Sequence, residues 1–451
     1  MTKKNEQIGN SRCDFLKNSA MLASLLAMKP ISSYSYFNEQ ENGKVRQGKM
    51  HGIQIGAVSF VDEGVENVLD FLQKEVNINT LFITVFTYGR GLAGRQIPGH
   101  PMPDHGSQVS DESTYHGGNY AMSHPKFYAR TVLKETRAPE HGDFDVLAAV
   151  LPEAKKRGMK VFASVEDQWR QDVPGLSNLR EYDLYGRRAN TLCLFNPDVK
   201  EFWTALVADL CSSYPIDGIL FFNERNGPFL SALGASHFQS IDSSRATCFC
   251  EHHRKAAEAY GLDFKRVTEG YRKLDIFVQK ALKDIRPSDG YYVEFQRLLL
   301  DYPEITAYDE LFDLAKHQIL KDVYATVKSI DKNMKVGFHI EHVNSFNPLF
   351  RSTRSYEDLA TMADFLKVVS YNNCAGERYA NFIRNIGSTV FRDVPLELLM
   401  RVNNRLLNYS ENEASLDQLP MSGLSADTVF RETRRAVEGV KGCLLYTSDA
   451  A

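Results

Sequence analysis

The stretch that decides the fold is NPDVKEFWTALVADLCSSYPIDGILFFNE, residues 196–224. Asn196 followed by proline is typical of a capped helix start, and the apolar spacing predicts that this helix continues to about Tyr214. Residues 217–222 are an apolar, β-rich run that predicts a buried strand. A helix followed by a buried strand is one unit of a βα repeat, which indicates a parallel sheet.

The same alternation continues on both sides of this stretch, without internal repeats or low-complexity linkers. Five further strands are expected, at 53–60, 80–88, 160–165, 335–340 and 365–371. Helices are expected at 65–76, 143–157, 251–331 (broken near Pro287 and Pro303) and 427–439. The pattern predicts an α/β fold of the (β/α)₈ TIM-barrel type, truncated at its C-terminus, with strands seven and eight missing. A doubly wound sheet shows the same alternation, but no Gly-rich phosphate loop follows the first strand.

The two ends of the chain differ in character from the middle. Basic residues precede a short apolar run, 20–28, which is too short to span a bilayer and is typical of an export signal in residues 1–35. Residues 11–17, SRCDFLK, resemble the twin-arginine export motif, with Cys13 in place of the second arginine. We therefore expect export by a bacterial-type signal, to the periplasm or the extracellular space.

Residues 443–451, CLLYTSDAA, resemble translated read-through of an adapter used in sequencing libraries. This resemblance implies an artefact tail and a natural protein that continues beyond Gly442. A genuine polar tail is the alternative. The barrel domain is accordingly expected over residues 48–442.

Composition excludes some classes of partner. The chain has 451 residues, of which 43% are hydrophobic and 24% charged, and its net charge is −4. It has no basic stripe, which argues against a nucleic-acid partner and against binding to an anionic membrane once the signal is removed.

Polar residues gather where the expected strands end, and in a TIM barrel the carboxyl ends of the strands form the active site. A carboxylate that directly follows an apolar strand is desolvated, and the resulting raised pKa suits a general acid. Any single glutamate at such a position is more often a loop-anchoring or ion-paired residue, but four strand ends that carry such residues together favour an active site. The strand-end residues are Glu166, Asp167 and Trp169 after the third strand, Asn223, Glu224 and Arg225 after the fourth, His339, Glu341 and His342 at the fifth, and Tyr371 and Asn372 at the sixth.

Two motifs resemble known glycosidases. Phe222-Asn223-Glu224 resembles the Asn-Glu pair that ends strand four in the clan A glycoside hydrolases, which implies that Glu224 is the acid/base and that Asn223 contacts the sugar 2-hydroxyl. The run CFCEHH, residues 248–253, is similar to a cysteine cluster of the family 42 β-galactosidases. The similarity covers about residues 140–345.

The family 42 resemblance implies further properties. It implies a structural zinc ion, no organic cofactor, a homo-oligomer, and a nucleophilic glutamate on strand seven, beyond Gly442. His253 stands where a fourth cysteine is expected, and His252 is an alternative ligand. A second alternative is that the thiols are buried and bind no metal. The implied zinc ligands are Cys193, Cys248, Cys250 and His253.

The leading functional hypothesis is hydrolysis of O-glycosidic bonds in an oligosaccharide or glycoside, with the fragment itself inactive. Trp169 and Tyr371 are candidate platforms for stacking on a sugar, and core packing explains Tyr371 equally well. Substrate binding is expected from Glu166, Asp167, Trp169, Arg225, His339, Glu341, His342, Tyr371 and Asn372. A metal-dependent sugar isomerase or epimerase is an alternative, because Glu166, Glu224, His339 and Glu341 carry oxygen and nitrogen ligands for a divalent cation. A glycan-binding barrel without catalysis is another.

Overall fold

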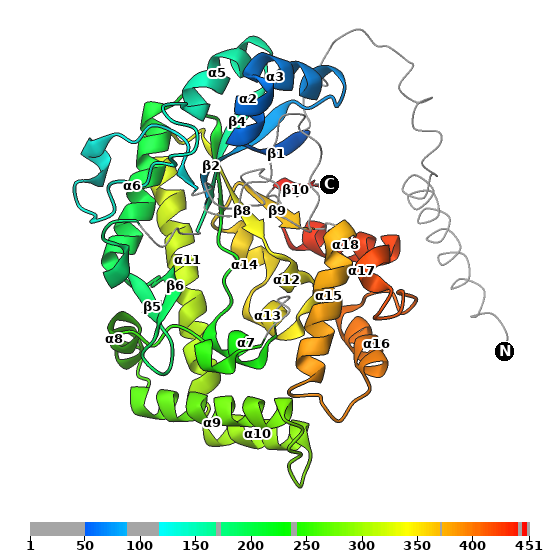
Figure 1. The fold of residues 1–451 in the computed structure, drawn as a ribbon. Helices are drawn as coiled ribbons and strands as arrows, with labels where there is room; N and C mark the ends of the chain where they lie inside the picture. Colours follow the sequence, from blue (N-terminus) through cyan, green and yellow to red (C-terminus); the bar gives the residue numbers. More distant parts are fainter. Residues whose placement is uncertain are drawn as a thin grey trace, which may run out of the picture.

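A computed structural model describes residues 50–87, 117–167, 173–235, 241–369, 372–440 and 444–448. Seven parallel strands form one curled sheet, in the order β1-β2-β4-β7-β8-β9-β10 (Figure 1). Their bounds are β1 Gly52–Gly56, β2 Thr80–Thr87, β4 Lys160–Glu166, β7 Gly218–Phe222, β8 Lys335–Ile340, β9 Phe365–Val369 and β10 Leu444–Ser448. The short β3 (Gly118–Asn119) pairs antiparallel with β2, and β5 (Arg180–Tyr182) and β6 (Arg188–Leu192) form a separate hairpin.

The order of the strands in the sheet is their order in the chain. A doubly wound sheet reverses its order at a switch point, whereas here every crossover advances in one direction. The sheet also curls, and this brings β9 close to β1. Lys367 on β9 donates a 2.5 Å hydrogen bond to Gln54 on β1, although the two strands are not neighbours in the sheet. The predicted α/β class with a parallel sheet is confirmed, and the curled half-barrel is compatible with a truncated TIM barrel.

The seventh position of the sheet differs from the prediction. The sequence pattern predicts that strands seven and eight are missing, but Leu444–Ser448 forms β10 and pairs in parallel with β9 over its whole length. Within the described ranges no eighth parallel strand is present. The read-through origin of residues 443–451 stays a prediction.

The expected first strand, 53–60, is shorter in the structure. The strand ends at Gly56, and the next seven residues form α2 (Ala57–Glu63), whose first four side chains are buried. A short apolar run fits a buried helix as well as a buried strand, so periodicity alone did not separate the two. The other five strands lie where the sequence predicts them, within one or two residues.

Side-chain caps determine where several of the helices begin. The expected helix 143–157 begins at Val146, because the Asp145 carboxylate accepts hydrogen bonds from the backbone N–H groups of Leu147 and Ala148. The expected region 251–331 consists of α8 (Glu251–Ala259), α9 (Phe264–Leu282), α10 (Tyr291–Asp301) and α11 (Glu304–Ile330). The remaining α-helices are α3 Val65–Lys74, α6 Pro197–Ser213, α7 Pro228–Leu233, α12 His342–Phe346, α13 Pro348–Thr353, α14 Tyr356–Ala360, α15 Asn372–Gly387, α16 Leu396–Leu407, α17 Leu419–Ser422 and α18 Ala426–Gly439. Among the described residues, every helix is too short or too polar to cross a bilayer. The expected export signal lies outside the described residues.

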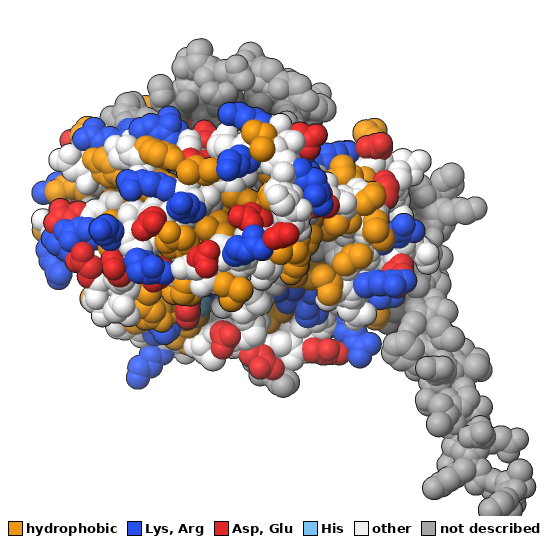
Figure 2. All heavy atoms as spheres, turned by 90° about the horizontal axis from the view of Figure 1, so that it is seen from below, with side chains coloured by type: hydrophobic (Ala, Val, Ile, Leu, Met, Phe, Trp, Pro, Cys, Tyr) orange, Lys and Arg blue, Asp and Glu red, His pale blue; other side chains and the backbone are white. Residues whose placement is uncertain are grey.

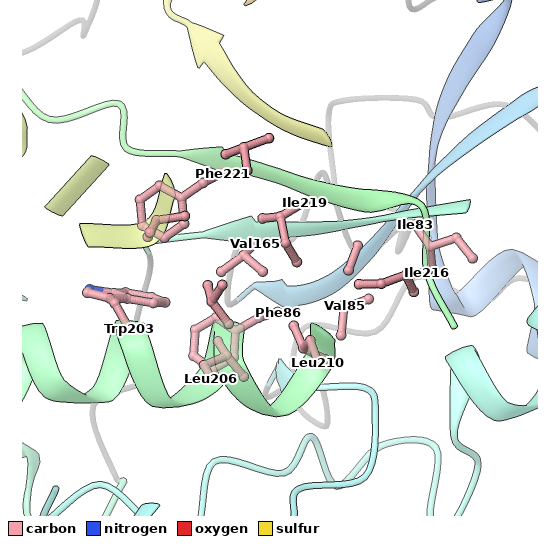
Figure 3. Close-up of a cluster of buried hydrophobic side chains, with 14 of the residues drawn as sticks. Ile83, Val85, Phe86, Val165, Trp203, Leu206, Leu210, Ile216, Ile219 and Phe221 are labelled. Carbon is pink, nitrogen blue, oxygen red and sulfur yellow. The ribbon is translucent and has the colours of Figure 1, made fainter. Parts of the chain in front are cut away.

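The two faces of the sheet carry different side chains, because successive residues of a strand point to opposite faces. On the outer face Trp203 of α6 packs against Phe86 and Phe221, with ring centroids 5.4 Å apart in both pairs (Figure 3). The inner face holds a smaller apolar cluster of Phe82, Phe162, Leu220, Phe222 and Phe365. Toward the carboxyl ends of the strands, the residues on this inner face are the polar residues of the candidate site.

The molecular surface carries charges of both signs. Figure 2 shows Lys and Arg side chains interspersed with Asp, Glu and apolar side chains on the face seen from below.

Candidate active site and a cysteine–histidine cluster

Glu224 lies two residues beyond the end of β7 and forms a hydrogen bond with a histidine on the next strand. His339 Nε2 is 2.6 Å from Glu224 Oε1, and the His339 ring packs on Phe222 with centroids 5.1 Å apart. The Glu224 side chain is 29% exposed and that of His339 only 5%, so the carboxyl can be approached while the imidazole supports it from behind. Burial, and next the charge of Lys367, lower the pKa of His339. The shared proton lies on His339 Nε2 when Glu224 is ionised and on the Glu224 carboxyl when Glu224 is protonated, with the imidazole neutral in both cases.

Glu166, the last residue of β4, is a second carboxyl near Glu224. It is buried, and the Thr87 hydroxyl donates a hydrogen bond to it. Burial raises its pKa to about 8, the Thr87 bond opposes this rise, and the charges of Glu224 and Asp167 add to it. Near neutral pH Glu166 is therefore mostly protonated, and its ionisation is coupled to that of Glu224.

Asp167, Asn223 and Arg225 form one hydrogen-bonded group beside Glu224. Asn223 Nδ2 donates to Asp167 Oδ2 at 2.7 Å, and Arg225 Nη1 donates to the same oxygen at 3.1 Å. The backbone N–H of Arg225 donates to Asn223 Oδ1 at 3.2 Å. These bonds fix the segment on both sides of Glu224.

Glu341 directly follows the last residue of β8, Ile340. Its Oε1 is 3.2 Å from the buried Lys316 Nζ, and among the described residues its Oε2 has no hydrogen-bond partner. Burial raises the pKa of Glu341, and the charge of Lys316 opposes the rise. A cavity of about 40 Å³ borders Asn223, His339 and Glu341. It is large enough for water and too small for a sugar ring.

The other predicted binding residues lie elsewhere or outside the description. His342 begins α12, is buried, and its Nδ1 is 2.8 Å from Nη1 of Arg378 on α15, within the helix layer. Trp169 and Tyr371 lie outside the described residues. Asn372 begins α15, but its side chain is not described.

The structure adds residues that the sequence analysis missed. Lys367 is fully buried on the inner face of β9, and burial lowers its pKa to about 8. A lysine within the apolar run FLKVV is a sequence signal that indicates this position. Thr87, Glu181 and Lys316 meet the site through tertiary packing, and no local pattern indicates them.

The four predicted zinc ligands lie together. Their ligand atoms are all within 4.8 Å of one another and all four residues are buried. Cys193 Sγ is 3.4 Å from Cys250 Sγ and 3.2 Å from His253 Nδ1. A tetrahedral zinc site with Zn–S bonds of about 2.3 Å places its ligand atoms roughly 3.5–3.8 Å apart, so the residues fit the ion. Among the described residues only His253, and not His252, belongs to this group.

The cluster also has the electrostatics of a thiolate site. Hydrogen bonds from Cys193 and Cys248 hold the pKa of the Cys250 thiol far below its ordinary value. Burial raises the pKa values of Cys193 and Cys248. A soft cation binds such sulfur and imidazole ligands as thiolates and neutral histidine.

The class that the fold and the site define is an α/β protein with a curled parallel sheet and a carboxyl-bearing site at the carboxyl ends of its strands. No protein-family model matches the sequence, and no curated protein is similar enough to count as a relative.

Several solved structures of glycoside hydrolases are similar in fold. The PgaB (BpsB) glycoside hydrolase domain from Bordetella bronchiseptica is 11% identical, with 89% of this chain and 94% of that chain covered and a TM-score of 0.42. A β-galactosidase from Rahnella sp. R3 is 14% identical, with 72% and 40% covered and a TM-score of 0.38. A GH20 exo β-N-acetylglucosaminidase from Vibrio harveyi is 10% identical, with 88% and 59% covered and a TM-score of 0.34. This chain thus spans about half the length of the last two. Because every TM-score is below 0.5, the functional proposal rests on the site.

Proposed function

We propose that the protein hydrolyses O-glycosidic bonds, with Glu224 as its acid/base residue. The observation that carries this proposal is the Glu224–His339 hydrogen bond of 2.6 Å at the carboxyl end of the fourth barrel strand, beside the buried Glu166. This arrangement holds one partly exposed carboxyl in a fixed orientation, within an environment that couples its ionisation to a second carboxyl.

In this proposal the carboxyl group of Glu224 donates its proton to the glycosidic oxygen while the bond from that oxygen to the anomeric carbon breaks. A second, ionised carboxylate must attack that carbon or deprotonate a water molecule. The resemblance to clan A enzymes implies a second carboxylate on strand seven, and we propose that it is contributed by sequence that would replace residues 443–451 in the natural protein. Glu166 is a proton-bearing neighbour in this scheme, and Asn223 remains the proposed contact for the sugar 2-hydroxyl.

The test is a Glu224→Gln substitution in the full-length protein. We expect at least a roughly 100-fold loss of turnover on unactivated disaccharides, because the proton donor is removed. The loss should be smaller on p-nitrophenyl glycosides, whose leaving group needs little protonation. Glu310→Gln, on an exposed face of α11, is the matched control. Full turnover of disaccharides by Glu224→Gln rules out the proposal, and glycan binding without turnover in the unmodified protein favours the non-catalytic alternative.

The isomerase alternative has less support from the geometry. Among the described residues, Glu166, Glu224, His339 and Glu341 do not form one compact set of metal ligands, because His339 bonds to Glu224 whereas Glu341 pairs with Lys316.

We further propose that Cys193, Cys248, Cys250 and His253 bind a structural zinc ion. Four protein ligands leave no open position, so zinc there ties chain segments together and supplies no chemistry to a substrate. We expect about one Zn²⁺ per chain by elemental analysis, and chelation should lower the melting temperature by several degrees. Cys250→Ser should abolish the bound metal, whereas Cys211→Ser, a buried thiol outside the cluster, should retain it. A full zinc content in Cys250→Ser contradicts this assignment.

The other proposals concern the whole protein. They are export by the signal in residues 1–35, an artefact tail at 443–451, and a homo-oligomeric assembly. The basic and apolar pattern of residues 1–35 supports export, and sequence resemblances support the other two.

A further inference from the structure

Arg225 follows Glu224 directly, and its guanidinium group is largely buried. The side chain is only 10% exposed. It donates to Asp167 Oδ2 at 3.1 Å and to the carbonyl oxygen of Leu192 at 2.8 Å, and its Nη2 pairs with Glu181 Oε1 at 2.5 Å. The planar guanidinium presents its donors in a rigid fork, so the two hydrogen bonds from Nη1 and the ion pair at Nη2 together fix its position.

The partners of Arg225 reach the segments that carry the cysteine–histidine cluster. Leu192 immediately precedes Cys193. Glu181, on β5, accepts hydrogen bonds through its Oε2 from Thr191 Oγ1 at 2.5 Å and from Thr247 Oγ1 at 2.8 Å. Thr247 immediately precedes Cys248. The residue before Cys193 therefore bonds to Arg225, and the residue before Cys248 bonds to Glu181, the partner of Arg225.

On its other side Arg225 is joined to the candidate active site. Asp167 accepts from Asn223 as well as from Arg225, and the carbonyl oxygen of Arg225 accepts from Lys316 Nζ at 2.8 Å. Lys316 also pairs with Glu341. Because a buried charge that loses its partner is costly, Arg225 cannot move relative to Glu181 without a large loss of stability.

We propose that Arg225 is a positioning residue that couples the cysteine–histidine cluster to the strand end carrying Glu224, so that metal bound in the cluster orders residues 223–225. The proposal rests on the function proposed above, since it gives the structural metal a role in holding the acid/base residue. Metal binding fixes the segments at Cys193 and Cys248 relative to each other. Those segments hold Leu192 and Glu181, which in turn hold the guanidinium of Arg225.

Amide hydrogen exchange of the full chain, stripped with a chelator and then reloaded with Zn²⁺, tests this coupling without any substrate. In the unmodified protein Zn²⁺ should slow exchange roughly fivefold or more, both in peptides that cover 193 and 248–253 and in peptides that cover 223–227. In Arg225→Met the first effect should remain and the second should disappear. Arg225→Lys should restore part of it, because one charged donor returns.

Arg187→Met is the matched control. Arg187 lies on the turn of the same hairpin and pairs with Asp183 at 2.7 Å, and its other contacts are with Tyr185 and Ser244, away from the strand end. In Arg187→Met, the zinc-dependent protection at 223–227 should equal that of the unmodified protein. If Arg225→Met fails to fold, Glu181→Gln removes the same ion pair and should give the same result.

The outcomes separate this inference from the proposed function. Zinc-dependent protection at 223–227 that survives in Arg225→Met and Glu181→Gln overturns the coupling, whatever the activity of Glu224→Gln. Protection confined to 193 and 248–253 in the unmodified protein also overturns it. If the chain binds no Zn²⁺, both the zinc proposal and the coupling are overturned. The role of Glu224 is then still decided by the Glu224→Gln experiment.

Discussion

Glu166 shows how the environment of a single residue changes its chemistry. The residue ends an apolar strand, as the sequence predicts, and burial raises its pKa from the ordinary 4.5 to about 8. Its place at a strand end follows from the sequence. Its burial, and the nearby charges of Glu224 and Asp167, come from strands that the sheet brings together.

The raised pKa of Glu166 predicts a loss of stability at alkaline pH. Below pH 4.5 the carboxyl is protonated in the folded and the unfolded chain, and its full contribution is present. Between about pH 4.5 and 8 the unfolded chain releases the proton while the folded chain retains it, so the free energy of unfolding falls as the pH rises. Glu166→Gln, which stays neutral, should be more stable than the unmodified protein by about 2–5 kcal/mol at pH 8.5, and by much less at pH 5.

Urea denaturation at the two pH values measures this difference. Glu310→Gln controls for the general effect of removing a carboxylate from the surface. An equal difference between Glu166→Gln and the unmodified protein at both pH values would show that Glu166 ionises normally in the folded state.

At the scale of elements, the strands were predictable where their apolar runs were bounded by turn residues and polar ends. The run after Gly56 was not, because a short run of four buried residues, three of them apolar, satisfies a helix and a strand alike. Helix starts depended on side-chain caps: Asn196 was recognised as a cap from the sequence, whereas the start at Val146 rather than 143 depends on the bonds that Asp145 makes.

The pairing of β7 with β8 sets the distance between Glu224 and His339, and Gly218 makes this pairing close. A Cβ atom at Gly218 would lie 1.9 Å from the carbonyl oxygen of Lys335 on β8. Gly218→Ala should therefore push the strands apart and lower the free energy of unfolding by about 2–4 kcal/mol. Lys160→Ala, at the exposed start of β4, should change it by less than about 0.5 kcal/mol. Equal urea midpoints for the two variants would contradict the close pairing.

At the scale of the whole molecule, β10 covers the edge of the sheet at β9. Five residue pairs join the two strands, from Leu444–Phe365 to Ser448–Val369. An exposed strand edge offers unpaired backbone groups to other chains. A chain that ends at Val440 should therefore melt several degrees lower and associate more readily than a chain lacking only residues 449–451. Calorimetry and size-exclusion chromatography measure both effects, and equal behaviour of the two truncated chains would show that β10 contributes little.

The sequence by itself determined the α/β class, the βα alternation, most strand and helix positions, and the placement of Glu166, Glu224 and His339 at strand ends. These features follow from local patterns of apolar, capping and turn residues, which act over a few neighbours. The sequence also indicated the four members of the cysteine–histidine cluster through their resemblance to a known motif. Only the tertiary structure decided that Glu224 bonds to His339, that Glu166 is buried beside them, and that Arg225 joins the cluster to the strand end through Glu181. These contacts join residues 44 to 115 positions apart in the chain, as Arg225 with Glu181 and His339 with Glu224 do. Local spacing carries no information about such distances, because the curl and register of the sheet set them.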